Sequence, residues 1–219
     1  MTAPLLQTHG SIEERYMMGG SVLVCGVDEA GRGPLAGPVV AAAVVFAPGT
    51  VIRGVADSKA LSEARRDLLA MDIRAKALAF AIAESTVDEI DDRNILQATL
   101  LAMRRAVDGL RVRPGHLLID GNKKFPSDIP ATAVVKGDSQ CFSIAAASIL
   151  AKTHRDAIMR RLDKEFPQYG FAVHKGYATR AHIEAIRAHG RCPQHRRSFI
   201  LKSISSQTGI FDDNPGIGP

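Results

Sequence analysis

Four acidic side chains follow short apolar runs in this sequence of 219 residues, and they carry its strongest chemical signal. Each stands where a predicted strand ends, close to a glycine, and together they are Asp28, Glu29, Asp120 and Asp138. Neighbouring strands lie about 4.8 Å apart, so carboxylates at adjacent strand ends can converge. Clustered carboxylates repel one another, and a divalent cation that prefers oxygen ligands, Mg²⁺ or Mn²⁺, relieves the repulsion.

A carboxylate-held cation can activate water, polarise a phosphodiester and stabilise the departing oxygen. Each acid taken singly also fits a purely structural role, because Asp before Gly is a common turn signal and Asp138 could cap a helix. Asp28 and Glu29 are adjacent and should point to opposite faces of a strand. They can share one site only if the backbone bends there, which the following glycines permit.

The apolar patterns predict the elements that must position these acids. Strands are expected at residues 22–27, 39–46, 78–82, 116–119 and 133–135. Helices are expected at residues 62–76, 91–110, 139–162 and 179–188. The helix at 91–110 has the clearest stripe, with apolar residues at i, i+3 and i+4 spacing.

The order of these elements favours an α/β fold with a mixed sheet. Early consecutive strands indicate an antiparallel meander, and the helix before His116 indicates a crossover to a parallel strand. Residues 1–20 are interpreted as a flexible lead-in, 21–204 as one domain, and 205–219 as a disordered tail.

The composition suits a polyanionic partner and a reducing compartment. The chain has 28 basic and 23 acidic residues, a formal charge of +5 and a pI near 9.3. Its cysteines, Cys25, Cys141 and Cys192, lie far apart and predict neither a disulfide framework nor a zinc site. No signal peptide or membrane span is evident, so we expect a cytoplasmic protein, and nothing calls for more than a monomer.

Several motifs resemble the ribonuclease HII family, in the family's order, from about residue 22 to residue 201. The first is the run from Asp28 to Pro38, DEAGRGPLAGP. The others are DSKALS from Asp57, IDGN from Ile119, VKGDS from Val135, AASILAK from Ala146 with Arg155-Asp156, FPQYG from Phe166, HKGY from His174 and HRRSF from His195.

The resemblance implies an RNase H-like fold, with a five-stranded mixed sheet flanked by helices and a helical C-terminal extension. It implies that Asp28, Glu29, Asp120 and Asp138 are the catalytic, metal-binding carboxylates, with Mn²⁺ or Mg²⁺ as cofactor. The implied activity is endonucleolytic: hydrolysis of the RNA strand of RNA–DNA hybrids and cleavage 5′ of ribonucleotides embedded in duplex DNA. The implied products carry 3′-hydroxyl and 5′-phosphate ends.

The resemblance also implies how the substrate is recognised. The backbone of Gly31, Arg32 and Gly33, together with Tyr177, would sense the ribose 2′-hydroxyl, the group that distinguishes RNA from DNA. Without the resemblance, we would interpret Tyr177 as a half-buried packing residue and His174 as a residue that packs within its loop. Lys59 is the favoured phosphate contact; further candidates are Lys152, Arg155, Lys175, Arg196 and Arg197. The loop and Tyr177 favour type HII over type HIII.

Three further functional interpretations of the sequence stay open. The tail residues Gln207, Thr208, Gly209, Ile210 and Phe211 resemble the short peptide that docks on bacterial sliding clamps. The chain could instead be a nucleic-acid-binding module without catalysis, although four clustered acids are costly without a metal. It could also hydrolyse small phosphate compounds with the same cluster. Inhibition by competing duplex, but not by nucleotides, separates a polymer substrate from a small one.

Overall fold

The protein is described here by a computed structural model that defines residues 11–17, 22–55 and 61–199. Five strands form one sheet in the order β3-β2-β1-β4-β5. The strands are β1 (Val24–Ala30), β2 (Val39–Val45), β3 (Ala79–Ser85), β4 (His116–Asp120) and β5 (Ala131–Val134). The pairs β1–β2 and β2–β3 are antiparallel, whereas β1–β4 and β4–β5 are parallel. The expected mixed α/β sheet is therefore confirmed.

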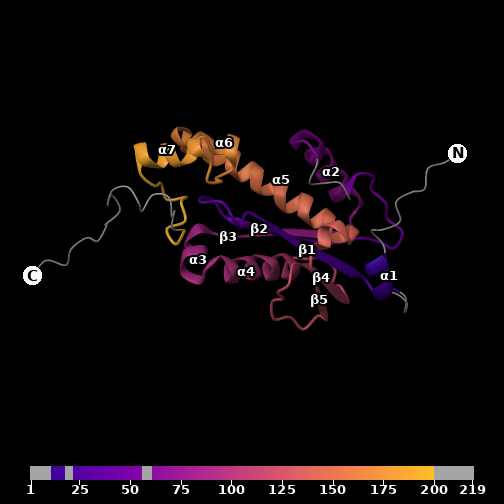
Figure 1. Ribbon diagram of the computed structural model, residues 1–219. Coiled ribbons are helices and arrows are strands. Elements are labelled where there is room, and N and C mark those ends of the chain that lie inside the picture. Colours follow the sequence, from indigo (N-terminus) through magenta and orange to yellow (C-terminus); the bar gives the residue numbers. More distant parts are fainter. Residues whose placement is uncertain (1–10, 18–21, 56–60, 200–219) are drawn as a thin grey trace, which may run out of the picture.

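Helices cover both faces of this sheet (Figure 1). They are α1 (Ser11–Met17), α2 (Glu63–Lys76), α3 (Val87–Arg93), α4 (Ile95–Asp108), α5 (Phe142–Glu165), α6 (Phe171–His174) and α7 (Arg180–His189). Two short 3-10 turns, η2 (Gly137–Ser139) and η3 (Pro167–Tyr169), flank α5. The long helix α5 runs along one face, α4 runs along the other, and α6 and α7 extend the molecule at one end.

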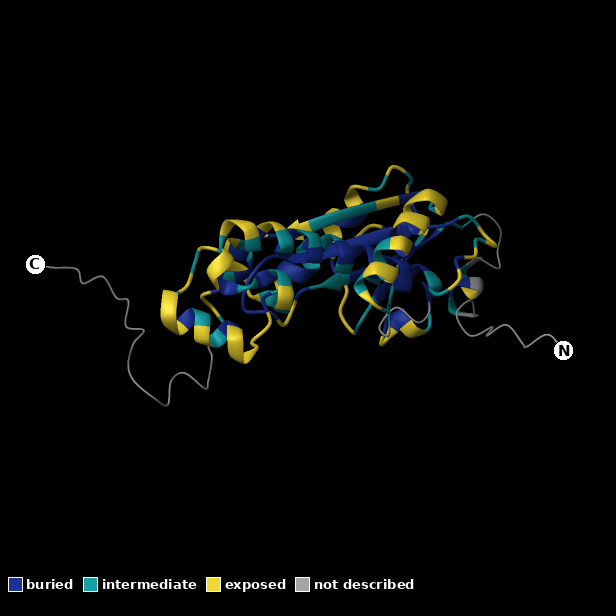
Figure 2. Cartoon of the chain, turned by 90° about the horizontal axis from the view of Figure 1, so that it is seen from above, coloured by how far each residue is buried: buried dark blue, intermediate teal, exposed yellow. Residues whose placement is uncertain are grey.

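The sheet has one hydrophobic core on each face, because side chains alternate between the two faces along its central strands. In β2, Val40, Ala42 and Val44 pack with α2 and α5, whereas Val39, Ala41 and other odd-numbered residues pack with α4. All seven residues of β2 are buried, as a strand covered on both faces requires. Figure 2 shows the same pattern as a dark buried centre with exposed outer helix faces.

The helix α5 approaches β1 very closely because both partners are small there. An added Cβ at Gly26 would overlap the backbone of Ser143 and Ile144, so only glycine fits at that position. The three alanines Ala145–Ala147 are fully buried in the same region. The first turns of α5 are thereby held directly against the strand that carries Asp28.

Two predictions of local structure were wrong. The helix expected over residues 91–110 is two helices, α3 and α4, separated at Asn94, whose φ is +70°. The Asn94 side chain accepts the backbone N–H groups of Leu96 and Gln97 and so caps α4. The second error concerns the flexible lead-in expected over residues 1–20, because residues 11–17 of that segment form α1.

Helix α1 is anchored by a buried acid. Glu13 is only 7% exposed, and its carboxylate accepts the backbone N–H of Ser143 at 2.7 Å and the Ser143 hydroxyl. Tyr16 stacks on His116 and shares a hydrogen bond with Thr132. The predicted tail over residues 205–219 lies outside the described residues, and the extent of the domain, 21–204, stays a prediction. Among the described helices, none has the length and apolar character needed to span a bilayer.

Candidate active site

Asp28 and Asp120 lie side by side on the sheet face that α5 covers. The register of the parallel pair β1–β4 ends with Val27 opposite Ile119, so the next residues on each strand are these two aspartates. Gly26 faces α5, and side chains alternate along a strand, so Asp28 points to the α5 side as well. Leu118 packs with Ile144 of α5, and Asp120 shares its face.

Asp138 joins this group from the turn that leads into α5. It lies in η2 and is 6% exposed. The preceding residue, Gly137, donates its backbone N–H to Oδ1 of Asp120 at 2.6 Å. The carboxylate that ends β4 is therefore bonded to the turn that carries the next acid, which brings the backbone of Asp138 next to Asp120.

Glu29, the fourth predicted acid, is placed differently from the other three. Strand β1 pairs regularly with β2 through Asp28, Glu29 and Ala30, so the backbone does not make the bend that would turn both acids to one face. Strand alternation directs the Cβ of Glu29 to the opposite face from Asp28, and its Oε1 lies 3.4 Å from Nη1 of Arg32. The Glu29 carboxylate still interacts electrostatically with Asp28 and Asp120, so it stays near them. The glycine loop starts one residue later, at Gly31.

The electrostatics of the cluster favour a bound cation. Burial raises the pKa of Asp28 well above its ordinary value, the charges of Glu29 and Asp120 raise it further, and a hydrogen bond with Ser148 acts in the opposite direction. Burial likewise raises the pKa of Glu29, with Arg32 lowering it and Asp120 raising it. These carboxylates repel one another across a poorly solvated space, which is the condition that a divalent cation relieves.

The donor set fits Mg²⁺ or Mn²⁺, which prefer oxygen ligands. Within residues 11–17, 22–55 and 61–199, no three His, Cys, Asp or Glu side chains are arranged as a closed metal-binding group. Asp28 and Asp120 end neighbouring strands, and Asp138 lies in the turn bonded to Asp120, so these three acids, with Glu29, are the candidate ligands.

The predicted substrate-binding residues lie around one loop, except for Lys59, which is outside the described residues. Arg32 and Gly33 are exposed and Gly31 is buried. Tyr177 is 46% exposed, and a Cβ placed on Gly33 would lie 3.8 Å from Cε1 of its ring. The structure therefore places the Tyr177 ring beside the loop, although the two are far apart in sequence.

Two of the basic residues proposed as phosphate contacts were misassigned. Arg155 and Arg196 are each 1% exposed and donate to backbone carbonyl groups inside the molecule. Lys175 is also largely buried and lies 3.5 Å from Glu63. Lys152, half-buried and paired with Asp156 at 2.6 Å, and the exposed Arg197 stay available as candidates.

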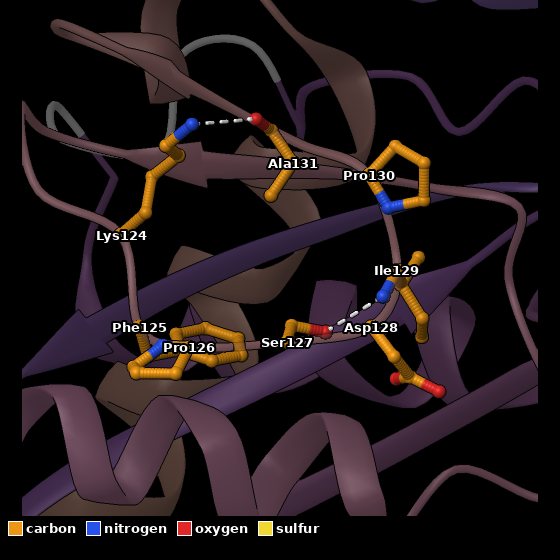
Figure 3. Close-up of a pocket in the computed structure, with 8 residues that line it drawn as sticks. All are labelled: Lys124, Phe125, Pro126, Ser127, Asp128, Ile129, Pro130 and Ala131. Carbon is orange, nitrogen blue, oxygen red and sulfur yellow. Dashed lines mark hydrogen bonds between the residues drawn. The ribbon is translucent and has the colours of Figure 1, made fainter.

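A pocket on the surface lies away from these residues. Residues 124–131 line a space of about 410 Å³ on the loop before β5 (Figure 3). Its one carboxylate, Asp128, pairs with Arg113 at 2.5 Å. This hollow contains none of the predicted site residues, so the candidate active site is the open edge of the sheet beside the glycine loop.

Sequence reasoning missed several residues that organise this edge. Ser148 contacts Asp28 from α5, and a histidine pair, His182 and His195, lies buried behind Tyr177. Asp91 holds the backbone of Arg197 and Ser198. Their motifs were visible, because Ser148 and His195 both fall inside the matched segments, but only the fold identifies their partners. His174, expected to be loop packing, does hydrogen-bond Tyr169 within its own loop.

Comparison with known proteins gives a consistent result. A sequence profile described as Ribonuclease HII matches residues 25–202. The ribonuclease HII of Acidovorax sp. (strain JS42) is 62% identical over 188 residues, which cover 86% of this chain and 90% of the relative.

Solved structures also match. The ribonuclease H2 of Pyrococcus horikoshii OT3 gives a TM-score of 0.70 at 27% identity, covering 81% of this chain and 93% of that one. The ribonuclease HII of Archaeoglobus fulgidus, solved in a complex with PCNA, gives 0.71 at 29% identity and covers 83% and 96%.

Proposed function

The chain belongs to the ribonuclease HII family and is a metal-dependent endonuclease that degrades RNA in RNA–DNA hybrids, and from this premise we propose a finer activity. It cuts on the 5′ side of ribonucleotides embedded in duplex DNA and leaves 3′-hydroxyl and 5′-phosphate ends. The observation that carries this proposal is that Asp28 and Asp120 end neighbouring strands, next to the turn of Asp138, in a protein whose Tyr177 ring lies beside the glycine loop.

The carboxylates have the central chemical role. When bound there, Mg²⁺ or Mn²⁺ supplies an activated water and stabilises charge on the reacting phosphate. Asp28 and Asp120 offer ligands from two adjacent parallel strands, and Asp138 offers one from the turn bonded to Asp120. Because burial raises the pKa of Asp28, binding of a cation and loss of the Asp28 proton would favour each other.

The glycine loop and Tyr177 provide the selectivity. A loop that lacks side chains at Gly31 and Gly33 lets a sugar approach the backbone, where peptide groups can meet the 2′-hydroxyl. The half-exposed Tyr177 ring supplies a flat apolar surface next to Gly33. Lys59, Lys152 and Arg197 contact phosphates in this scheme, and the formal charge of +5 strengthens binding at low salt.

A cleavage assay tests this proposal. The substrates are an end-labelled DNA duplex with one central ribonucleotide, an all-DNA duplex and an RNA–DNA hybrid, each with Mg²⁺, Mn²⁺ or EDTA. We expect metal-dependent cleavage 5′ of the ribonucleotide, no cleavage of all-DNA, and loss of both activities in Asp28→Asn. Asp72→Asn, at an exposed position of α2, is the matched control.

Other outcomes would separate the alternatives. Cleavage of the hybrid but not of the single-ribonucleotide duplex would remove the finer activity. Competition by nucleotides as strong as by unlabelled duplex would favour a small-molecule hydrolase. Binding of duplex without any cleavage would favour a binding module.

We also propose that the protein acts as a cytoplasmic monomer that can join a protein partner. The Archaeoglobus relative was solved in a complex with PCNA, which gives the family a precedent for such a partner. In this chain the candidate segment is Gln207, Thr208, Gly209, Ile210 and Phe211, with Ile210 and Phe211 as apolar anchors for a sliding clamp. A pull-down with a purified bacterial clamp tests it: binding that is unchanged in Phe211→Ala would reject this segment.

A further inference from the structure

Two separate parts of the chain form the proposed ribonucleotide-recognition site, and one short segment contacts both. The parts are the glycine loop, residues 31–33, and Tyr177. The segment is residues 192–199, which follows α7 and contains the motif from His195 to Phe199. We propose that the 192–199 segment sets the position of the glycine loop relative to Tyr177 and thereby determines selectivity for embedded ribonucleotides; this inference rests on the proposed function.

Arg196 holds the glycine loop from inside. Its Nη1 donates to the carbonyl of Arg32 at 2.9 Å and its Nη2 to the carbonyl of Gly31 at 2.5 Å, while Nε donates to Gly37 at 3.0 Å. Arg155 adds bonds to Ala36, Pro38 and Lys175. Gly31 has a φ of +99°, and an added Cβ would overlap the Arg155 side chain.

These bonds determine which side of the loop is presented to a substrate. In a planar trans peptide the N–H points opposite to the C=O. Because the carbonyls of Gly31 and Arg32 face Arg196, the N–H groups of Arg32 and Gly33 point away from it. The outer side of the loop is thus a donor surface, suited to an oxygen of the sugar-phosphate backbone.

The positive charge behind the loop adds to this effect. Burial and the neighbouring Arg155 lower the pKa of Arg196 to about 9, so the group stays charged at neutral pH. Burial also lowers the pKa of Arg155. Across the described part of the chain, carbonyl groups rather than carboxylates are the bonded partners of both guanidinium groups. The positive charge of the two groups, partly offset by Asp91 and Asp156, favours electron-rich groups at the donor surface.

The adjacent residue, His195, reaches Tyr177 through a chain of hydrogen bonds. The backbone N–H of Cys192 donates to Nδ1 of His195 at 2.9 Å, which places the His195 proton on Nε2. That nitrogen donates to Nε2 of His182 at 3.1 Å, and Nδ1 of His182 donates to the carbonyl of Tyr177 at 2.9 Å. Both histidines are almost fully buried, so this chain fixes the Tyr177 backbone.

Backbone bonds complete the connection between the two parts. Gly37 donates to Gln194 and Arg196 donates to Leu35, both at 2.8 Å, and Leu35 in turn donates to Gly176, next to Tyr177. Consecutive residues of one segment, His195 and Arg196, therefore contact the supports of Tyr177 and of the glycine loop. A shift of this segment would move both.

Asp91 anchors the segment from outside the recognition site. Its carboxylate accepts the N–H groups of Arg197 and Ser198 at 2.9 and 3.0 Å and the Ser198 hydroxyl at 2.6 Å. Asp91 belongs to α3, on the α4 side of the sheet. Its replacement loosens the segment without removing any group that touches the loop or Tyr177, which makes it the residue of choice for a test.

The experiment compares kcat/KM on the single-ribonucleotide duplex with kcat/KM on an RNA–DNA hybrid, with the metal-loaded protein. For Asp91→Ala we expect about a tenfold fall in the ratio of the two values, expressed mainly as a higher KM for the ribonucleotide duplex. The control is Asp92→Ala, the next residue on α3, whose side chain is 77% exposed. Arg196→Lys, which keeps the charge but not the fork of donors, should lower the same ratio further.

The outcomes are distinct. If Asp91→Ala lowers both activities equally, or leaves the ratio at the wild-type value, the inference is overturned while the proposed function stands. If wild type does not cut the ribonucleotide duplex at all, the proposed function fails and the inference with it. Thermal unfolding of each variant shows whether folding is intact, and a changed ratio at an unchanged melting temperature supports a positioning role.

Discussion

The carboxylate of Asp120 accepts the backbone N–H of Gly137 at 2.6 Å. This bond joins the end of β4 to the turn that precedes α5, and Asp138 is the residue that follows Gly137. One acid of the candidate active site thereby holds the backbone that presents another. Because an amide oxygen accepts the same bond, the chemical and structural roles of Asp120 can be separated by substitution.

Asp120→Asn should abolish cleavage and leave the fold intact. Asn keeps an oxygen for the Gly137 N–H but removes the negative charge that a cation needs. We expect kcat on an RNA–DNA hybrid to fall by about 100-fold or more, with a melting temperature within a few degrees of wild type. Asp120→Ala, which also breaks the bond to Gly137, should lower the melting temperature further. Equal activity in Asp120→Asn and wild type would exclude Asp120 from the site.

Asp28→Asn should stabilise the metal-free protein. The raised pKa of Asp28 means that its contribution to stability is present at low pH and is lost as the pH rises through the folded-state pKa. Removing the charge should therefore add about 1–3 kcal/mol to the free energy of unfolding at pH 7.5 in EDTA. Urea unfolding measures this difference. A variant less stable than wild type in EDTA would contradict it.

Divalent cations should make wild type more stable than Asp28→Asn, the reverse of the order expected in EDTA. A ligand that binds only the folded state stabilises it by about 2.7 kcal/mol at 100 times its dissociation constant. Wild type should gain this stability on titration with Mn²⁺, and Asp28→Asn should gain much less. Equal stabilisation of both proteins would mean that the ion binds elsewhere.

Acid should destabilise the histidine chain behind Tyr177. Burial, and then the neighbouring His182, lower the pKa of His195 from 6.5 to about 4. The unfolded chain therefore gains a proton first, and stability falls as the pH drops from 6.5 towards 4, by about 3 kcal/mol for this group. Unfolding free energies of wild type and His195→Gln should be measured across this range. The wild type should lose more stability than the variant; parallel curves would remove His195 as the cause.

Glu13→Ala should weaken the attachment of α1. The buried Glu13 carboxylate accepts the N–H and hydroxyl of Ser143, and the alanine variant leaves both donors without that acceptor. A loss of about 1–3 kcal/mol in the free energy of unfolding is expected. Arg15→Ala, at an exposed position of the same helix, is the control and should change little. Equal losses in both variants would point to helix propensity instead of the bond.

The sequence predicted the main elements because their patterns are periodic. The apolar run over residues 39–46 located β2, and the stripe over residues 91–110 located α4 but not its separation from α3. Ser62 and Thr179 cap the helices that were expected to begin beside them. The break at Asn94 was missed because a positive φ depends on one residue's backbone and leaves the apolar spacing nearly unchanged. Helix α1, seven residues long, is stabilised by contacts with distant residues rather than by its own pattern.

Part of the candidate site could be predicted as well. The positions of acids after apolar runs predicted Asp28, Glu29, Asp120 and Asp138 as the site, and the parallel register places Asp28 and Asp120 at neighbouring strand ends. Arg155 and Arg196 were assigned to the surface because charged residues usually lie there. Their burial depends on carbonyl groups supplied by a loop more than 100 positions away, which local sequence cannot reveal. The same distance hid the connection between His195 and Tyr177.

The bond between Arg196 and Gly31 spans 165 positions of the chain. During synthesis the glycine loop leaves the ribosome early, whereas the guanidinium group that orients it arrives only after all five strands and α7 have emerged. The strands that carry the candidate acids can therefore form before the loop acquires its final shape. Under the proposed function, a nascent chain at that stage would hold its carboxylates in place but would not yet distinguish an isolated ribonucleotide from a continuous hybrid.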